Sequence, residues 1–200
     1  TMKKLILNIK WDEAWENIGA EKIPFSKFYD SYNESHRFYH NQNHIFEGIF
    51  DLFYAKSLAE NYNELLVAWL LHDIVYDVHA NDNEEKSAEF LNDININLET
   101  KERIKKLILA TKHNGTAQTN DEKLIVDIDL LIFSHSYSDI KEYDDSIRKE
   151  YSFVPDDIFK RERGKILNNF YNKDRIYNLY KEAEIAAKFN LKKLIGERYP

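Results

Sequence analysis

Residues 65–76 read LLVAWLLHDIVY, and this run decides what the rest of the fold has to provide. An apolar run of this kind belongs in a protein core, yet it contains the adjacent polar residues His72 and Asp73. Burying an ionised carboxylate without a counter-charge costs several kcal/mol, roughly, after the surroundings relax. The pair therefore predicts a cationic partner. A metal ion is the simplest candidate, because imidazole and carboxylate are both good ligands.

The composition predicts one globular all-α domain that spans residues 1–200. Hydrophobic residues make up 43% of the chain, and only five glycines and three prolines occur. So few chain breakers, together with many Leu, Ile, Lys, Glu and Asn residues, favour long helical stretches. We expect a helical core over about residues 30–135 and further, tyrosine-rich helices over about residues 137–195.

Apolar residues recur at helical spacing along most of the chain. Pro155 fits a helix start, and Asn114-Gly115 is expected to stop the preceding helix. A second apolar run occupies residues 124–133, and it is the one segment for which a strand is an alternative to a helix. The length of this run and its helical surroundings favour a helix. The expected helices lie around residues 11–18, 25–32 and 45–53, from residue 63 through the apolar run, from about residue 83, and over 100–113, 121–133 and 137–195.

Charge and residue content exclude several classes of function. The net charge is −7 and no Lys/Arg block stands out, which disfavours a surface for duplex nucleic acid but not a small anion in a local basic pocket. The absence of cysteine excludes disulfides, thiolate zinc sites and thiol nucleophiles. No apolar run reaches the roughly 18 residues of a membrane span, and no secretory signal is visible. We expect a cytoplasmic protein with no membrane partner.

Three of the seven histidines lie four residues apart, at positions 36, 40 and 44. On a helix, His36 and His44 would be about 12 Å apart, because each residue rises 1.5 Å. All three therefore cannot bind one ion. The stripe supplies at most two neighbouring ligands, and His36 fits a solvated helix face better.

Two further aspartates, Asp127 and Asp129, lie inside the second apolar run. Asp129 raises the same difficulty as Asp73, because a carboxylate among Leu, Ile and Val needs a cation. Asp127 fits equally well as a capping or solvent-facing residue. The candidate ligands now stand in a fixed order along the chain: His44, then His72 and Asp73, then Asp129.

This order resembles the HD superfamily of metal-dependent phosphohydrolases, whose signature is a His, a His-Asp pair and an Asp on an all-helical core. The chain is most similar to the subgroup of predicted HD phosphohydrolases with an R-x-Y-H-N-x-x-H motif. The resemblance covers roughly residues 30–195. The matching stretches are RFYHNQNHI at 37–45, AWLLHDIVYD at 68–77, NEEKSA at 83–88, TKH at 111–113 and DIDL at 127–130.

The resemblance implies one divalent metal ion and leaves room for a second. Two imidazoles and two carboxylates suit Mn, Fe, Co, Ni, Zn or Mg without choosing among them. Such an ion would polarise a phosphoryl oxygen and activate water. The implied ligands are His44, His72, Asp73 and Asp129, with Asp127 as a competitor for the last place.

Residues around the metal receive roles from the same resemblance. His40 is expected beside the ion, Glu84 and Glu85 to orient water or accept a proton, and His113 to contact substrate or a second metal. Each also has a plain structural interpretation, as a favourable first helical turn for the two glutamates and a C-terminal cap for His113. The candidates for holding phosphate are Arg37, Asn41, Arg148 and Arg163, since guanidinium groups suit paired oxygens.

The main hypothesis is a metal-dependent phosphohydrolase, either a phosphomonoesterase or a phosphodiesterase. Its substrate would be a small phosphorylated molecule, with nucleotides as candidates. One alternative is a di-iron oxygenase of the same superfamily, in which His79 or His113 would serve the second iron. Another is a non-catalytic sensor that binds a metal or a nucleotide. The sequence leaves the oligomeric state open, with a homodimer as one option.

Overall fold

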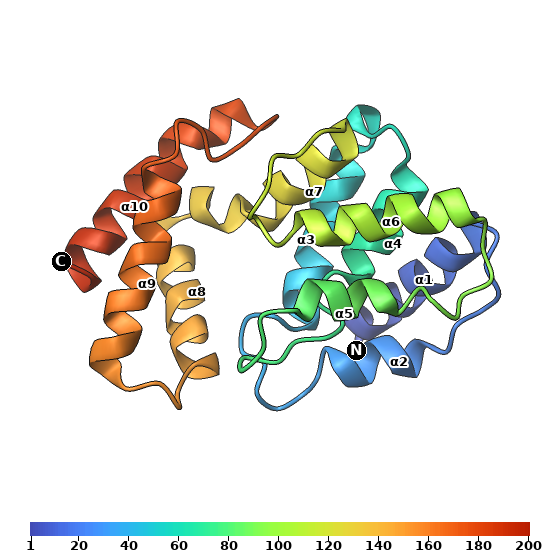
Figure 1. Cartoon of the computed structure of the whole chain (residues 1–200), viewed down its shortest axis with the longest axis horizontal. Helices are drawn as coiled ribbons and strands as arrows, with labels where there is room; N and C mark the ends of the chain where they lie inside the picture. Colours follow the sequence, from blue (N-terminus) through green and yellow to red (C-terminus); the bar gives the residue numbers. More distant parts are fainter. The chain divides into compact units, whose positions relative to one another are not determined.

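The computed structural model describes the whole chain, Thr1–Pro200, and confirms the all-α prediction. Ten α-helices and three short 3-10 helices follow one another, with no strand (Figure 1). They form two compact units, unit 1 (Thr1–Val126) and unit 2 (Asp127–Pro200). The α-helices are α1 (Met2–Asn17), α2 (Phe25–Ser31), α3 (Gln42–Tyr54), α4 (Tyr62–Leu71), α5 (Asn83–Glu89), α6 (Leu98–Ala110), α7 (Asn120–Asp129), α8 (Tyr137–Glu150), α9 (Asp156–Tyr171) and α10 (Glu184–Arg198). The 3-10 helices are η1 (Lys56–Leu58), η2 (Leu131–Ser134) and η3 (Lys181–Ala183).

Helix α4 is the central helix of unit 1. It packs against α1, α3 and α6 (Figure 1). Every residue from Leu65 to Leu71 is buried. Trp11 and Trp15 of α1 are buried as well, with their rings edge to face at 5.3 Å. Because neighbours cover α4 on several sides, its sequence is apolar all round instead of striped.

Gly48 of α3 lies directly against the Trp69 side chain of α4. A Cβ atom at this position would overlap the Trp69 indole, so the side chain of Trp69 needs a glycine on α3. The indole Nε1 donates a hydrogen bond to the Ile45 carbonyl of α3 at 2.9 Å. Trp69 therefore fixes the spacing of the two helices that carry His44 and His72.

The apolar run at residues 124–133 is helical, as expected, but in two pieces. Helix α7 ends at Asp129, and η2 continues the turn from Leu131. At the other end of α7, the buried Asp121 accepts hydrogen bonds from the backbone N–H groups of Glu60 at 2.7 Å and Asn61 at 2.8 Å. Asn61 in turn caps α4, so this carboxylate joins the starts of two helices.

Unit 2 contains the end of α7, from Asp127 to Asp129, followed by η2, α8, α9, η3 and α10. Helix α10 packs against α8, α9 and η2, and its Asn190 amide donates hydrogen bonds to the carbonyls of Phe133 and His135. Pro155 stands immediately before α9, as the sequence predicts. No helix of the chain combines the length and the apolar composition that crossing a membrane would require.

Two helices end earlier than predicted. Helix α4 ends at Leu71, with His72 as its C-terminal cap, instead of continuing through the apolar run. Helix α6 ends at Ala110, earlier than the Asn114-Gly115 stop, and Thr111 is its C-terminal cap. His113 itself adopts the left-handed conformation, with φ of 56°. Histidine is among the residues that tolerate this region better than most, which is why the chain turns before reaching the glycine.

Candidate metal centre

Three of the four predicted ligands converge inside unit 1. His44 lies in the first turn of α3, His72 caps the end of α4, and Asp73 follows directly. One ligand atom from each residue lies within 4.8 Å of the other two. The sequence order of these ligands thus becomes a cluster in space, formed where the start of α3 meets the end of α4.

The cluster has the geometry that a small cation requires. The two Nε2 atoms of His44 and His72 are 3.3 Å apart, and Asp73 Oδ2 lies 3.1 Å from His72 Nε2 and 3.8 Å from His44 Nε2. The side chains of His72 and His44 are 1% and 7% exposed, while that of Asp73 is 14% exposed. A half-buried carboxylate facing two ring nitrogens fits a divalent metal with mixed nitrogen and oxygen ligands.

The orientation of the His72 ring is fixed by its other nitrogen. Nδ1 lies 2.8 Å from the Trp69 carbonyl, to which it donates a hydrogen bond, and the Trp69 indole stacks on the ring at 4.5 Å. With the proton on Nδ1, the lone pair of Nε2 faces the cluster. Such a carbonyl partner is typical of metal-ligating histidines, because it sets the tautomer.

Hydrogen bonds within unit 2 distinguish Asp127 from Asp129 as candidates for the fourth metal ligand. The buried Asp127 accepts through Oδ1 from the Asn178 N–H and side-chain amide, and through Oδ2 from the N–H groups of Leu179 and Tyr180. Both of its oxygens are therefore committed to the backbone of residues 178–180. Asp129 is the half-buried last residue of α7, and its role as a ligand remains a prediction.

The structure assigns Arg37 to the backbone instead of to a phosphate. Its side chain is fully buried, and its guanidinium donates to the carbonyls of His40 at 3.1 Å, Asp73 at 2.6 Å and Ile74 at 3.0 Å. The remaining Nε donates to Glu34 at 2.9 Å. Arg37 therefore ties the His40 turn to the Asp73 turn, and its fork is not available to a substrate.

His40 and Asn41 also lie beside the cluster. The His40 ring is 6.3 Å from the His44 ring, centroid to centroid, and stacks on Tyr76 at 4.2 Å. Asn41 caps α3, accepting from the Asn43 N–H at 2.9 Å and donating to the Phe38 carbonyl at 3.0 Å. Asn41 thus positions the helix that carries His44, and its contact with phosphate stays a prediction.

The two glutamates at the start of α5 have different surroundings. Lys112 binds both carboxylate oxygens of Glu85, at 2.6 and 2.8 Å, and this bond lowers the pKa of Glu85. Glu84 is half-buried, and its pKa is raised, first by burial and also by the negative charge of Asp73. Of the two, Glu84 is therefore the carboxylate whose pKa is affected by a residue of the cluster, and it is better suited to take up a proton.

The remaining histidines are placed as follows. The His36 ring Nε2 is 2.9 Å from the Tyr76 carbonyl, so His36 braces a loop and does not extend the ligand stripe. His79 is exposed, with its backbone N–H bound to Asp77. His113 is half-buried at its left-handed turn after α6, and the cluster of potential ligands consists of His44, His72 and Asp73 without it.

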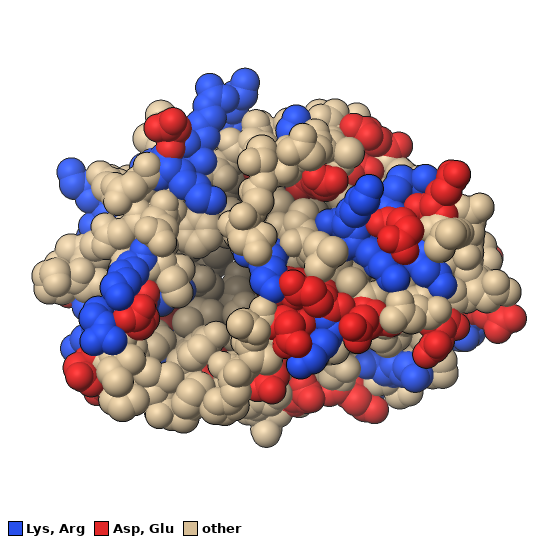
Figure 2. Space-filling model, viewed as in Figure 1, with Lys and Arg blue, Asp and Glu red and all other residues tan.

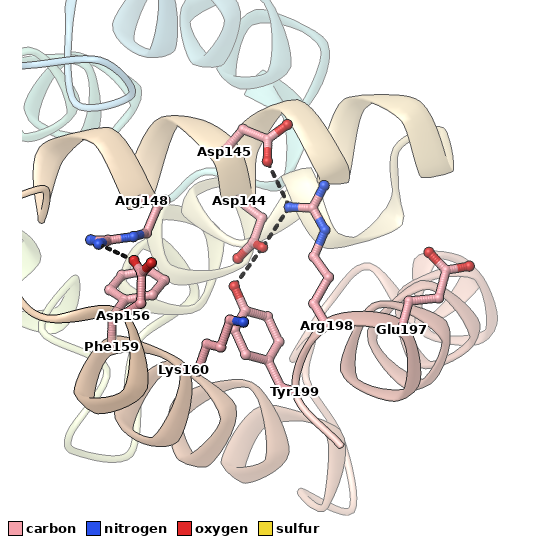
Figure 3. Close-up of a pocket in the computed structure, with 9 residues that line it drawn as sticks. All are labelled: Asp144, Asp145, Arg148, Asp156, Phe159, Lys160, Glu197, Arg198 and Tyr199. Atoms are coloured by element: carbon pink, nitrogen blue, oxygen red, sulfur yellow. Dashed lines mark hydrogen bonds and ion pairs between the residues drawn. The ribbon is translucent and has the colours of Figure 1, made fainter.

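In unit 2, Arg148 is engaged by its own helix end. It donates to the carbonyls of Tyr151 at 2.6 Å and Val154 at 3.0 Å, and pairs with Asp156 at 2.6 Å (Figure 3). It lines a pocket of about 400 Å³ formed by the end of α8, the start of α9 and the end of α10. Arg148 thus closes the turn between α8 and α9, and its contact with phosphate stays a prediction.

The buried Arg163 serves a carboxylate of the chain. Its Nε donates to Asp144 at 3.0 Å, and the other oxygen of Asp144 accepts from Arg198 and from the Tyr199 hydroxyl (Figure 3). The hydrogen bond to Asp144 and burial raise the pKa of Tyr199, burial being the larger cause. Arg163 therefore belongs to a structural network, and its contact with phosphate stays a prediction.

Sequence reasoning missed two residues that shape the cluster. Trp69 supplies the carbonyl and the ring that orient His72, and Lys112 holds the start of α5 by binding Glu85 and the Asn81 carbonyl. The glycine at position 48 is the one sequence signal for the close approach of Trp69. The only sequence signal for Lys112 was its position between Thr111 and His113 in a stretch that matches the resemblance.

The face of unit 1 seen in Figure 2 carries charges of both signs. In the view of Figure 2, Lys and Arg side chains are interspersed with Asp and Glu side chains over unit 1 and form no continuous basic field. A small anion near the cluster would therefore be held by local groups and not by a broad positive surface.

Comparison with known families bears on the same residues. A family model described as "HD domain" matches residues 52–133, a segment that starts after His44 and includes His72, Asp73 and Asp129. No curated protein and no solved structure matches the chain. Residues 52–133 therefore match the HD-domain family, as the resemblance predicted.

Proposed function

We propose that this protein is a metal-dependent phosphohydrolase acting on a small phosphate ester, with nucleotides as candidate substrates. The observation that carries the proposal is the convergence of His44, His72 and Asp73 next to and within the HD domain. HD domains generally occur in metal-dependent phosphohydrolases, although some are non-catalytic. Asp129 is proposed as the fourth ligand, on the basis of the resemblance and of the commitment of Asp127 elsewhere.

The donor set and its burial support this chemistry. A divalent ion held there would supply Lewis-acid activation of water and of the phosphoryl group. The chain contributes fixed ligands, because Trp69 orients His72 and Arg37 anchors the backbone of Asp73. It also contributes an imidazole, His40, close enough to His44 to contact a bound phosphate.

Glu84 is proposed as the proton acceptor. Burial raises the pKa of Glu84 above its ordinary value, and the negative charge of Asp73 raises it further, which favours proton uptake. Glu84→Gln should therefore lower kcat by about 10²–10⁴-fold, the usual contribution of general acid–base catalysis. Glu85→Gln is the matched control, because Glu85 is bound to Lys112, and it should leave kcat nearly unchanged.

The direct test uses full-length protein that has been stripped of metal and reloaded with Mn, Fe, Co, Ni, Zn or Mg. Each form is assayed for phosphate release from a panel of nucleotide monoesters and diesters. We expect release with at least one metal and its loss in His72→Ala and Asp73→Asn. A folded, metal-loaded protein that releases no phosphate with any metal would refute the proposal.

The same samples separate the alternatives. Metal analysis should give one ion per chain, whereas two irons per chain with oxygen uptake would point to an oxygenase. Metal-dependent nucleotide binding without turnover would point to a sensor. The convergence of one set of three ligands favours the mononuclear hydrolase.

A further inference from the structure

The segment at residues 176–180, here called the α7 clasp, grips the end of α7. Asp127 is 0% exposed, and four N–H donors of the clasp bind its two oxygens at 2.6 to 3.2 Å. Three of these donors are consecutive backbone N–H groups, of Asn178, Leu179 and Tyr180. This is a dense set of hydrogen bonds for one carboxylate, and it holds the Asp127 side chain in one orientation.

A second contact binds the clasp to the residue after α7. The Tyr177 hydroxyl donates to the Leu130 carbonyl at 2.8 Å, and Tyr177 is 1% exposed. The clasp is itself held by Glu184, whose carboxylate accepts from the N–H groups of Ile176 and Tyr177 at 2.9 to 3.1 Å. The clasp therefore contacts the chain on both sides of Asp129.

Helix geometry links these contacts to Asp129. Residues two apart on an α-helix are separated by about 200° around its axis, so Asp127 and Asp129 point to nearly opposite sides. Fixing Asp127 against the clasp therefore fixes the direction in which Asp129 points. Asp129 is the last residue of α7, where helices fray most readily, and the bond to Leu130 restrains this end.

We propose that the α7 clasp positions the metal ligand Asp129, with Asp127 and Tyr177 as positioning residues. This inference rests on the proposed function, because it takes Asp129 as the fourth ligand. Residues 176–180 lie outside the matched HD segment. In this proposal they affect metal affinity without binding the metal themselves. Residues that orient metal ligands typically change affinity by about 10–100-fold when they are removed.

The test is Mn²⁺ affinity, measured by calorimetry on full-length protein well below its unfolding temperature. Asp127→Asn should weaken Mn²⁺ binding about 10-fold or more, and Tyr177→Phe, which deletes one hydroxyl, by several-fold. The matched control is Asp121→Asn, at the opposite end of α7. Asp121 is also a buried carboxylate that binds two backbone N–H groups, so its loss should lower stability but leave Mn²⁺ affinity within about twofold of the wild type.

A second readout follows coordination itself. The absorption spectrum of bound Co²⁺ should change in Asp127→Asn and Tyr177→Phe in the same sense as in Asp129→Asn, and it should stay as in the wild type in Asp121→Asn. If Asp127→Asn does not fold, Tyr177→Phe decides. This spectrum reports on the ligands and is not moved by a loss of stability alone.

The outcomes separate this inference from the proposed ligand set. If Asp129→Asn leaves affinity unchanged, the ligand set itself fails. If Asp129→Asn weakens binding while Asp127→Asn and Tyr177→Phe bind Mn²⁺ like the wild type, the clasp is only structural and the inference is overturned. An equal loss of affinity in Asp121→Asn would overturn it too, because any weakening of α7 would then suffice.

Discussion

Asp73 in unit 1 and Asp144 in unit 2 are both largely buried aspartates, and the chain treats them differently. Asp144 is 1% exposed, and its oxygens accept from Arg163 at 3.0 Å, Arg198 at 2.8 Å and the Tyr199 hydroxyl at 2.7 Å. The Asp73 carboxylate instead faces ring nitrogens of His72 and His44, at 3.1 and 3.8 Å. A guanidinium is permanently charged, whereas an imidazole offers a lone pair and only a pH-dependent charge.

This difference distinguishes a structural carboxylate from a candidate ligand. Two guanidinium groups neutralise Asp144, so the chain alone completes its environment. Arg37 also contacts Asp73, but it donates to the Asp73 backbone carbonyl, at 2.6 Å, and so fixes the backbone of this residue. For Asp73 and Asp144, the groups that contact the carboxylate oxygens therefore predict function better than the degree of burial does.

The largest effect should follow from breaking the Asp144 network. Asp144→Ala leaves the buried Arg163 without its counter-charge, and such changes cost about 3–5 kcal/mol. Urea unfolding measures the loss, and Mn²⁺ affinity of the folded variant should stay unchanged. Asp145→Ala is the control, because the Asp145 side chain is 59% exposed and its pair with Arg198 should contribute about 1 kcal/mol or less. Equal losses in the two variants would contradict the distinction.

Replacing Arg37 should damage both folding and the metal centre. Arg37→Lys keeps the charge but lacks the planar fork that reaches three carbonyls, so it should cost about 2–4 kcal/mol by leaving buried acceptors unsatisfied. Urea unfolding and Mn²⁺ titration should both show the loss, while KM for the phosphate ester, measured at saturating metal, stays near the wild-type value. A rise in KM with unchanged stability would restore the phosphate contact predicted from the sequence.

Sequence reasoning identified the ligands better than their supports, for a physical reason. The apolar run of α4 makes His72 and Asp73 conspicuous, because polar residues in such a run need an explanation that is visible locally. The network of Asp144 joins α8 to α9 and to the end of α10, and the bonds of Asp127 join α7 to residues 178–180. Partners so far apart in sequence leave no periodic pattern, so only the tertiary fold brings them into view.

The arginines show the same limit. Guanidinium groups near a predicted phosphate site fit phosphate binding on chemical grounds, and the sequence cannot tell which of them the chain uses internally. The helices were easier, because hydrophobic periodicity and capping residues are local signals. Even there, the end of α6 was set by the left-handed turn at His113, for which the sequence offered a glycine two residues later as the more obvious signal.

A bound ion should stabilise the protein through Asp73 and not through Asp144. Ligand at 100 times its Kd stabilises the folded state by about 2.7 kcal/mol, so Mn²⁺ should raise the unfolding free energy by that amount and a chelator should reverse it. Asp73→Asn should abolish this increment, because an amide is a weaker ligand. Asp145→Ala should retain it in full. A metal increment that survives in Asp73→Asn would show that the ion binds elsewhere.

The smallest effect should come from replacing Arg148, because its ion pair is more exposed than the contacts of Asp73 and Asp144. Its partner Asp156 has a side chain that is 80% exposed, and Arg148 is itself 31% exposed. Solvent screens such a pair, so Arg148→Gln should change the unfolding free energy by about 1 kcal/mol or less, chiefly through the carbonyls of Tyr151 and Val154. KM for the phosphate ester should be unaffected, because the guanidinium closes its own helix end. A several-fold rise in KM at unchanged stability would instead make Arg148 a substrate contact. Ion pairs within the chain would then not predict which arginines bind phosphate.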